Sequence, residues 1–241
     1  MPLNLITELG ESNSVLRSKI MPRMFCLVDS KVQEAEYFLD RILFNDRDFF
    51  GVQCDAVAFA SSSRSITFAM QACLKGIPEF DKWYEERQSD LRADPLARFF
   101  NEFRRVSIHI GDNAVVGGAS GDGKVLYYFG ALPDLSEVPE DDVATVCTQY
   151  FTNTLRLVYD CYMKFPALIN SQWRFTKEHF ASMGKTIEDA IEEIGFPRGW
   201  SAVSGFDEDT QWRCLRKEVD GCNIQDQFHR WLGKVVPYPD H

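Results

Sequence analysis

The sequence predicts an all-α protein with a bundle of four main helices, a small inserted β-hairpin, and a short helical C-terminal appendage. Two observations support the helices. Apolar residues recur at helical spacing between residues 32 and 162, and residues 52–74 contain neither proline nor glycine. A third observation supports the hairpin, because a cluster of glycine, serine and aspartate at residues 117–123 is followed by a β-prone run.

Length and composition are those of a globular protein that can bury a full core. The chain has 241 residues, of which 45% are hydrophobic and 26% charged. The apolar runs are short and interrupted by charge, and the first 20 residues lack the pattern of a signal peptide. We therefore expect a protein without a membrane span.

Seven cysteines are spaced widely and form no C-x-x-C pair. Reduced thiols in the cytoplasm fit this pattern best. The net charge of −10 excludes a general electrostatic attraction to nucleic acid. Any contact with RNA would need a local basic patch.

The first two helices are predicted from their start and stop signals. Ser30 and Gln33 match a capping box for a first helix that reaches about Asn45. Asp46 is the expected N-cap of a long second helix that ends near Lys75, before Gly76 and Pro78. Small residues fill the middle of this second helix, which lets another helix approach closely.

The third and fourth helices are separated by an Asp-Pro pair. The third covers about Glu79 to Leu91, and Asp94-Pro95 provides a cap and a first-position proline for the fourth. Six apolar residues of the fourth helix fall within about a 120° arc at 100° per residue. They are Leu96, Phe99, Phe100, Phe103, Val106 and Ile110.

After Gly111 the pattern changes to a hairpin at about residues 114–129. The acidic run at residues 139–142 then opens another long helix, which Pro166 closes. Three short helices are predicted near residues 177–183, 187–194 and 224–232. Three tryptophans of this region are expected in aromatic-anchored loops: Trp200, Trp212 and Trp231.

Three segments follow from this pattern. Residues 1–30 are predicted to form an N-terminal arm, residues 31–166 the helical bundle with its hairpin, and residues 167–241 the C-terminal appendage.

The glycine-rich segment at residues 118–124 has the spacing of a phosphate-binding loop. Such a loop ends in serine or threonine and opens a helix, whereas here Val125 follows and begins a β-prone run. The sequence therefore favours a hairpin turn over a nucleotide site.

No metal and no cofactor is predicted. Histidine occurs at four positions and no H-E-x-x-H motif is present. The acidic residues around Glu188 and Glu192 are typical of a solvated helix face. No catalytic triad can be assigned from spacing.

One pair of residues in the centre of the chain has catalytic potential. Arg104 can bind and neutralise a phosphate, and His109 is of the type that moves the proton of a ribose 2′-hydroxyl. Together they would suffice for metal-free cleavage of RNA through a 2′,3′-cyclic phosphate. On one continuous helix, however, residues five apart point about 140° away from each other. Convergence needs either a loosened helix before Gly111 or a second subunit.

The helical pattern around this pair resembles the HEPN superfamily. The resemblance rests on the small-residue helix around Ala60–Phe68, on Phe80-x-x-Trp83-Tyr84, and on the segment from Phe99 to His109. It covers roughly residues 31–166. It implies a four-helix bundle, a homodimer with two motifs in a shared cleft, and the arginine-x4-6-histidine ribonuclease motif.

The resemblance implies a metal-independent endoribonuclease of the toxin and defence type. Arg104 would bind phosphate, His109 would be the general acid or base, and Arg64 and Arg105 would bind substrate. RNA and an antitoxin or other protein partner are the expected partners. The family usually has a small polar residue where this chain has Arg105, which leaves two interpretations open: added phosphate-binding charge, or an inactive member.

Two alternatives to an enzyme remain. One is a catalytically inert module that binds a nucleotide, RNA or a protein through the same cleft. The other is a plain helical scaffold in which the Arg104/His109 spacing is coincidental, and which predicts no dimer cleft.

Overall fold

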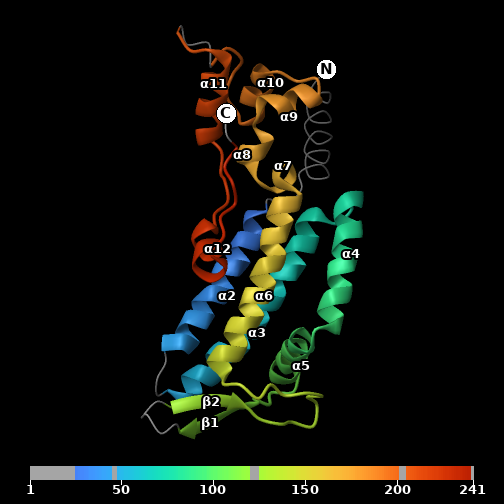
Figure 1. The fold of residues 1–241 in the computed structure, drawn as a ribbon, viewed down its shortest axis with the longest axis vertical. Coiled ribbons are helices and arrows are strands. Elements are labelled where there is room, and N and C mark those ends of the chain that lie inside the picture. The colour runs from blue at the N-terminus through green and yellow to red at the C-terminus, as the bar shows by residue number, and fades with distance from the viewer. Residues whose placement is uncertain (1–24, 45–47, 120–124, 201–204, 240–241) are drawn as a thin grey trace, which may run out of the picture.

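The structure, a computed structural model, describes residues 25–44, 48–119, 125–200 and 205–239 (Figure 1). This part of the chain is mostly helical and has one two-stranded antiparallel sheet. Its larger elements are α2 (Cys26–Phe44), α3 (Phe49–Leu74), α4 (Pro78–Ala93), α5 (Pro95–His109), β1 (Val115–Ala119), β2 (Val125–Phe129) and α6 (Val143–Lys164). Smaller helices follow: α7 (Pro166–Ile169), α8 (Ser171–Arg174), α9 (Lys177–Ser182), α10 (Ile187–Glu193), α11 (Glu208–Lys217) and α12 (Gln225–Leu232).

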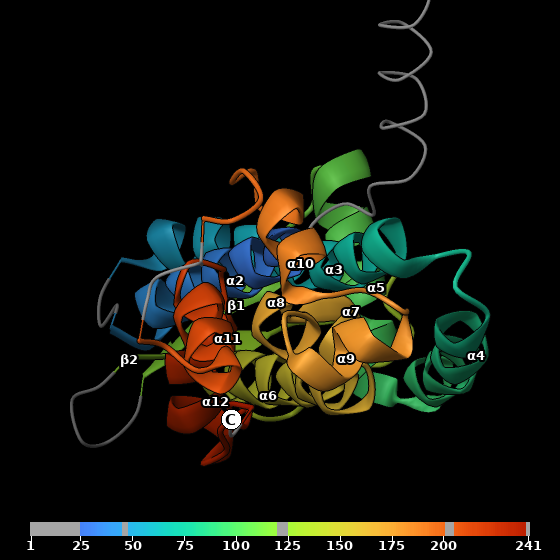
Figure 2. The ribbon, with the colours of Figure 1, turned by 90° about the horizontal axis from the view of Figure 1, so that it is seen from above.

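Three long helices form the body of the molecule. Figure 1 shows α2, α3 and α6 running side by side along its long axis, and the same three lie together in the view from above (Figure 2). Helix α5 packs across them near the hairpin, and α4 lies along one side. The predicted all-α fold with a small hairpin is therefore confirmed, while its assignment to the HEPN bundle stays a prediction.

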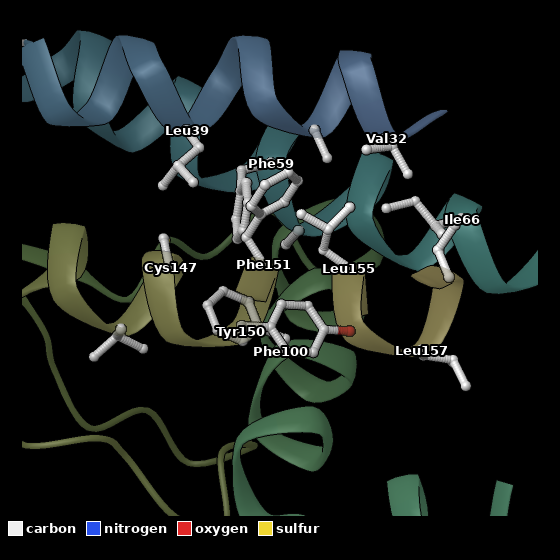
Figure 3. Close-up of a cluster of buried hydrophobic side chains, with 14 of the residues drawn as sticks. Val32, Leu39, Phe59, Ile66, Phe100, Cys147, Tyr150, Phe151, Leu155 and Leu157 are labelled. Carbon is white, nitrogen blue, oxygen red and sulfur yellow. The ribbon is translucent and has the colours of Figure 1, made fainter. Parts of the chain in front are cut away.

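Aromatic rings fill the centre where α3, α5 and α6 meet. Phe100 of α5 stacks on Tyr150 of α6 with 4.3 Å between ring centroids, and Phe59 of α3 packs edge-on against Phe100 at 5.7 Å (Figure 3). Small residues beside Phe59, such as Ala56 and Ala60, are fully buried. Their small side chains let α2 pack closely on α3, as the composition of this helix predicted.

The hairpin forms where the sequence placed it. Gly118 pairs with Leu126 and Ala119 with Val125 in an antiparallel register, and the tip at 120–124 lies outside the described residues. A strand follows the glycine-rich segment, so the hairpin interpretation is confirmed over a phosphate-binding loop. The ring of Phe129 packs against the ring of Phe99 with 4.8 Å between their centroids, and this contact fixes the hairpin against α5.

The starts of the first two helices differ from prediction. Helix α2 begins at Cys26, and Ser30 lies inside it with its hydroxyl donating to the Cys26 carbonyl at 2.9 Å, so the capping box predicted at Ser30 is wrong. The predicted cap Asp46 lies outside the described residues. Asp48 caps α3 instead, because its carboxylate accepts from the Gly51 N–H at 2.9 Å.

The C-terminal segment packs in two ways. Residues of α8 to α11 enclose their own small core, which contains Phe180, Ile191 and Trp212. Helix α12 instead returns to the long helices, where Phe228 is fully buried in the main core. Figure 1 shows this division, with α7 to α11 at one end of the molecule and α12 beside α2 and α6.

The loop position predicted for Trp212 is wrong, because this residue lies in α11. Trp231 lies in α12, which matches the helix predicted near residues 224–232 and not the loop expected for this tryptophan. Helix α11 was missed because it has few apolar residues. Its signal is the N-cap Asp207 followed by an acidic first turn and a basic last turn.

Buried Glu36 anchors α12 on α2. Its carboxylate accepts from the Gln227 side chain at 2.7 Å, the Trp231 indole at 2.7 Å and the Arg230 guanidinium at 3.0 Å. Arg230 also pairs with Asp40 at 2.6 Å. The contact between Glu36 and Arg230 joins residues that lie 194 positions apart in the sequence.

None of the helices in the described ranges combines the length and the apolar character that crossing a membrane requires.

Candidate functional site

Helix α5 carries three of the four predicted site residues. Its N-cap Asp94 accepts from the Leu96 N–H, and Pro95 occupies the first position, as predicted. The helix continues through His109, and the Ile110 N–H still bonds to the Val106 carbonyl at 2.9 Å. A loosened helix therefore does not bring Arg104 and His109 together, and they remain about 140° apart around the axis.

His109 lies exposed at the C-terminal end of α5. Its neighbours Ile108 and Ile110 are also exposed, at 49% and 51%. Ile110 was predicted to lie on the buried face, and this prediction is wrong because the helix ends before the residue reaches the core. The end of α5 thus presents His109 between two uncovered apolar side chains.

Arg64 of α3 is half-buried and lies beside the first half of α5, where it lines a pocket with Asn101. Its guanidinium donates to the Thr67 hydroxyl at 3.1 Å and lies 4.4 Å from the centre of the Phe68 ring. Its Nε is buried and has no hydrogen-bond partner. The same holds for the Nε of Arg104. No ion pair among the described residues involves either arginine.

Arg64 and Arg104 both act electrostatically on the buried side chain of Tyr150. Burial raises the pKa of Tyr150 to about 12, and the positive charges of Arg64 and Arg104 both act to lower it. The phenol therefore stays protonated and can donate a hydrogen bond at neutral pH. Two of the four predicted site residues thus act on one buried phenol, and we call Arg64, Arg104 and Tyr150 the basic centre.

Arg105 points elsewhere. Its guanidinium donates to the Asp134 carbonyl at 3.3 Å. Beside it, the pKa of Glu102 is lowered, first because its carboxylate accepts a hydrogen bond from the Ser136 N–H. The positive charges of Arg105 and Arg98 lower the pKa further. Arg105 thus helps to hold the loop after the hairpin against α5 and does not join the basic centre.

Helices α3 and α5 pack along a shared seam and carry further buried polar atoms without a partner. They are the hydroxyls of Ser63 on α3 and Ser107 on α5. Buried polar groups are normally hydrogen-bonded, so donors of this kind are available to water or to a ligand. Ser107 lies one helical turn after Arg104 on the same side of α5.

Sequence reasoning missed Tyr150, which looked like one more apolar residue of α6. It also missed Asn101 and Arg98, which precede Arg104 on α5. The spacing of Asn101 and Arg104, three residues apart, was the available signal, because such residues share a helix face. Across the ranges that the structure covers, no group of three or more His, Cys, Asp or Glu side chains could hold a metal ion.

Comparison with known proteins gives one family. The family described as Bacteriophage lambda protein ea47 matches residues 35–128. This stretch contains α3, α4 and α5, and therefore Arg64 and Arg104, but it ends before Tyr150. No curated protein and no solved structure matches the chain.

Proposed function

We propose that this protein binds a phosphate-bearing ligand of the ribonucleotide class, free or within RNA, at the basic centre. The observation that carries the proposal is that Arg64 and Arg104, neither of which forms an ion pair within the described ranges, each have a buried Nε without a hydrogen-bond partner, and that both act on the neutral phenol of Tyr150. Arginine binds phosphate through its planar set of donors, and a protonated phenol adds one more. This is the non-catalytic interpretation of the Arg104/His109 motif. The binding would take place in the cytoplasm, where the sequence predicts the protein to be.

The acidic chain makes the local charge important. The net charge is −10, so binding to phosphate depends on this basic centre and not on the whole surface. Removing one arginine should therefore weaken binding strongly. Hydrogen bonds to charged groups contribute about 1.5–3 kcal/mol each, which corresponds to about 10-fold to 100-fold in affinity.

The test is binding of a fluorescein-labelled single-stranded RNA, followed by anisotropy at low salt. Arg64→Ala and Arg104→Ala should each weaken binding about 10-fold or more. Arg156→Ala is the matched control, because Arg156 is an exposed arginine of α6 that donates to Asn153. Equal loss in all three variants, or no binding by the wild-type protein, would contradict the proposal.

The second candidate is the metal-independent endoribonuclease of the HEPN type. One observation favours it: His109 lies between the exposed side chains of Ile108 and Ile110, an arrangement that a second copy of the chain could cover. In such a homodimer, His109 of one protomer would move the proton while Arg104 of its partner neutralises the phosphate. The 2′-oxygen would bond to phosphorus as the 5′-oxygen leaves with a proton.

Cleavage is tested by incubating the purified protein with a mixed RNA pool in EDTA and analysing the fragment ends. This candidate predicts 2′,3′-cyclic phosphates with the wild-type protein, and none with His109→Ala or Arg104→Ala. It also predicts a dimer by light scattering that Ile108→Asp disrupts. Intact RNA in the presence of a confirmed dimer would leave binding as the function.

A further inference from the structure

A small pocket opens beside the basic centre, between α3, α4, α5 and α6. Its volume is about 190 Å³. Arg64, Arg92 and Arg98 line it, together with Asn101, Tyr84 and Tyr150. None of the described residues that line it is an aspartate or a glutamate. In a chain with 36 acidic and 26 basic residues, such a lining indicates an anion.

The start of α5 adds to the positive potential. Ala97 and Arg98, in the first turn of this 15-residue helix, face the pocket. Peptide dipoles place a partial positive charge at a helix N-terminus.

Two carboxylates lie near the pocket. Asp94 caps α5 through the Leu96 N–H, and Glu137 pairs with Arg98 at 3.4 Å on the surface. An exposed pair of this kind contributes little, so Arg98 can turn to a stronger anion. Arg92, which donates to Gln88, has no carboxylate partner among the described ion pairs.

Neutral groups complete the lining. Tyr84 donates to the Thr67 carbonyl at 3.4 Å and accepts from the Gln71 amide at 3.3 Å, so its ring is held in place. The exposed amide of Asn101 is available to donate. Fixed aromatic walls and a few polar groups are typical of a small-ligand pocket.

Size and charge together select the ligand group. The volume is below the ~300 Å³ at which pockets for drug-sized ligands begin, so the pocket takes a single group and not a whole nucleotide. A phosphate monoester carries about −1.5 to −2 charges at pH 7 and three acceptor oxygens. An internal phosphodiester carries one charge and continues as a chain on both sides. Three arginines therefore match the monoester better.

We propose that this pocket receives the terminal phosphate monoester of the ligand, from a free nucleotide or from an RNA end. The inference rests on the proposed function and adds to it the part of the ligand that is recognised. The ester would enter with its terminal oxygens toward Arg64, Arg92 and Arg98, and the rest of the ligand would extend along the seam toward Arg104.

The experiment compares one labelled oligoribonucleotide with a 5′-phosphate, with a 3′-phosphate and without a terminal phosphate. The wild-type protein should bind at least one phosphorylated form about 10-fold more tightly than the unphosphorylated form. Asn101→Asp places a carboxylate at the pocket without changing the size of the side chain. It should bring the ratio of the affinities for the phosphorylated and the unphosphorylated form close to one. Asn153→Asp, an exposed position on α6, adds the same charge elsewhere and should keep the ratio.

The outcomes separate the two proposals. If all three oligonucleotides bind equally and still depend on Arg104, the terminal-phosphate inference is wrong while the proposed function stands. If none binds and a nucleoside monophosphate does not bind either, both are wrong. Competition by the nucleoside monophosphate identifies the free nucleotide as the source, and competition by the phosphorylated oligonucleotide alone identifies the RNA end.

Discussion

The hydroxyl of Tyr162 on α6 donates a hydrogen bond of 2.8 Å to the carboxylate of Asp29 on α2, and both side chains are buried. The Asn223 N–H approaches the other carboxylate oxygen at 3.4 Å. The three residues thereby join α2, the long helix α6 and the C-terminal segment before α12. Burial raises the pKa of Asp29 to about 6, although both hydrogen bonds act to lower it.

This raised pKa predicts that stability falls as pH rises. Asp29 loses its proton near pH 4 in the unfolded chain but near pH 6 in the folded one, so the folded state holds more protons between these values. The contribution of Asp29 is therefore lost as the pH rises from about 4 to about 6. Two pKa units correspond to on the order of 3 kcal/mol.

Urea unfolding of the wild type and of Asp29→Asn at pH 4.5 and pH 7 tests this. The free-energy difference between the two proteins should shift in favour of the variant at pH 7. Asp226→Asn, an exposed position on α12, should show no such shift. A constant difference between the wild type and Asp29→Asn at the two pH values would refute the prediction.

Glu36→Gln should loosen α12. The substitution keeps the size of the side chain but removes the charge that three donors approach. We expect the free energy of unfolding to fall by about 2 kcal/mol. Relative to the wild type, amide hydrogen exchange in this variant should accelerate more in α12 than in α3. Glu34→Gln removes an exposed partner of Lys31 on the same helix and should change stability by less than about 0.5 kcal/mol.

Phe100→Ala should destabilise the whole protein, because Phe100 is 1% exposed and packs on Tyr150, Phe59 and Phe129. Removing a buried phenylalanine costs about 3–5 kcal/mol. Phe50→Ala removes a ring that is 73% exposed and should cost less than about 0.5 kcal/mol. Chemical unfolding measures both, and similar losses would show that Phe100 is not central to the core.

Trp212→Ala should open the small C-terminal core while the long helices stay folded. Trp212 is 2% exposed and packs 5.4 Å from the ring of Phe180. Because this cluster is separate from the main core, amides of α9 to α11 should lose protection and those of α3 and α6 should keep it. Trp200→Ala, at a position that is 62% exposed, is the control. Simultaneous loss of protection in both parts would mean that the two cores unfold as one.

Local signals predicted the helices and the hairpin well. Asp94-Pro95 fixed the start of α5, and the glycine-rich run followed by a β-prone run placed the hairpin. These signals act over a few residues, so they can be read without the fold. Their failures were local too: α2 already begins at Cys26, before Ser30, and Asp48 caps α3 in place of the predicted Asp46.

The candidate site was predictable in part. Arg64 and Arg104 were recognised as basic residues of interest, but that both act on Tyr150 depends on how α3, α5 and α6 cross. The position of His109 likewise depends on where α5 ends. Periodicity places a side chain on a face of its own helix, and the packing of helices decides which faces meet.

The sequence by itself determined the helical class, the position of the hairpin and the types of residue available for phosphate binding. The tertiary structure decided which of these residues share a site, and it separated Arg105 and His109 from Arg64 and Arg104. It also decided that α12 returns to α2 through Glu36 and Arg230, 194 residues apart. Such contacts arise from burial of apolar surface between distant segments, which no local pattern records.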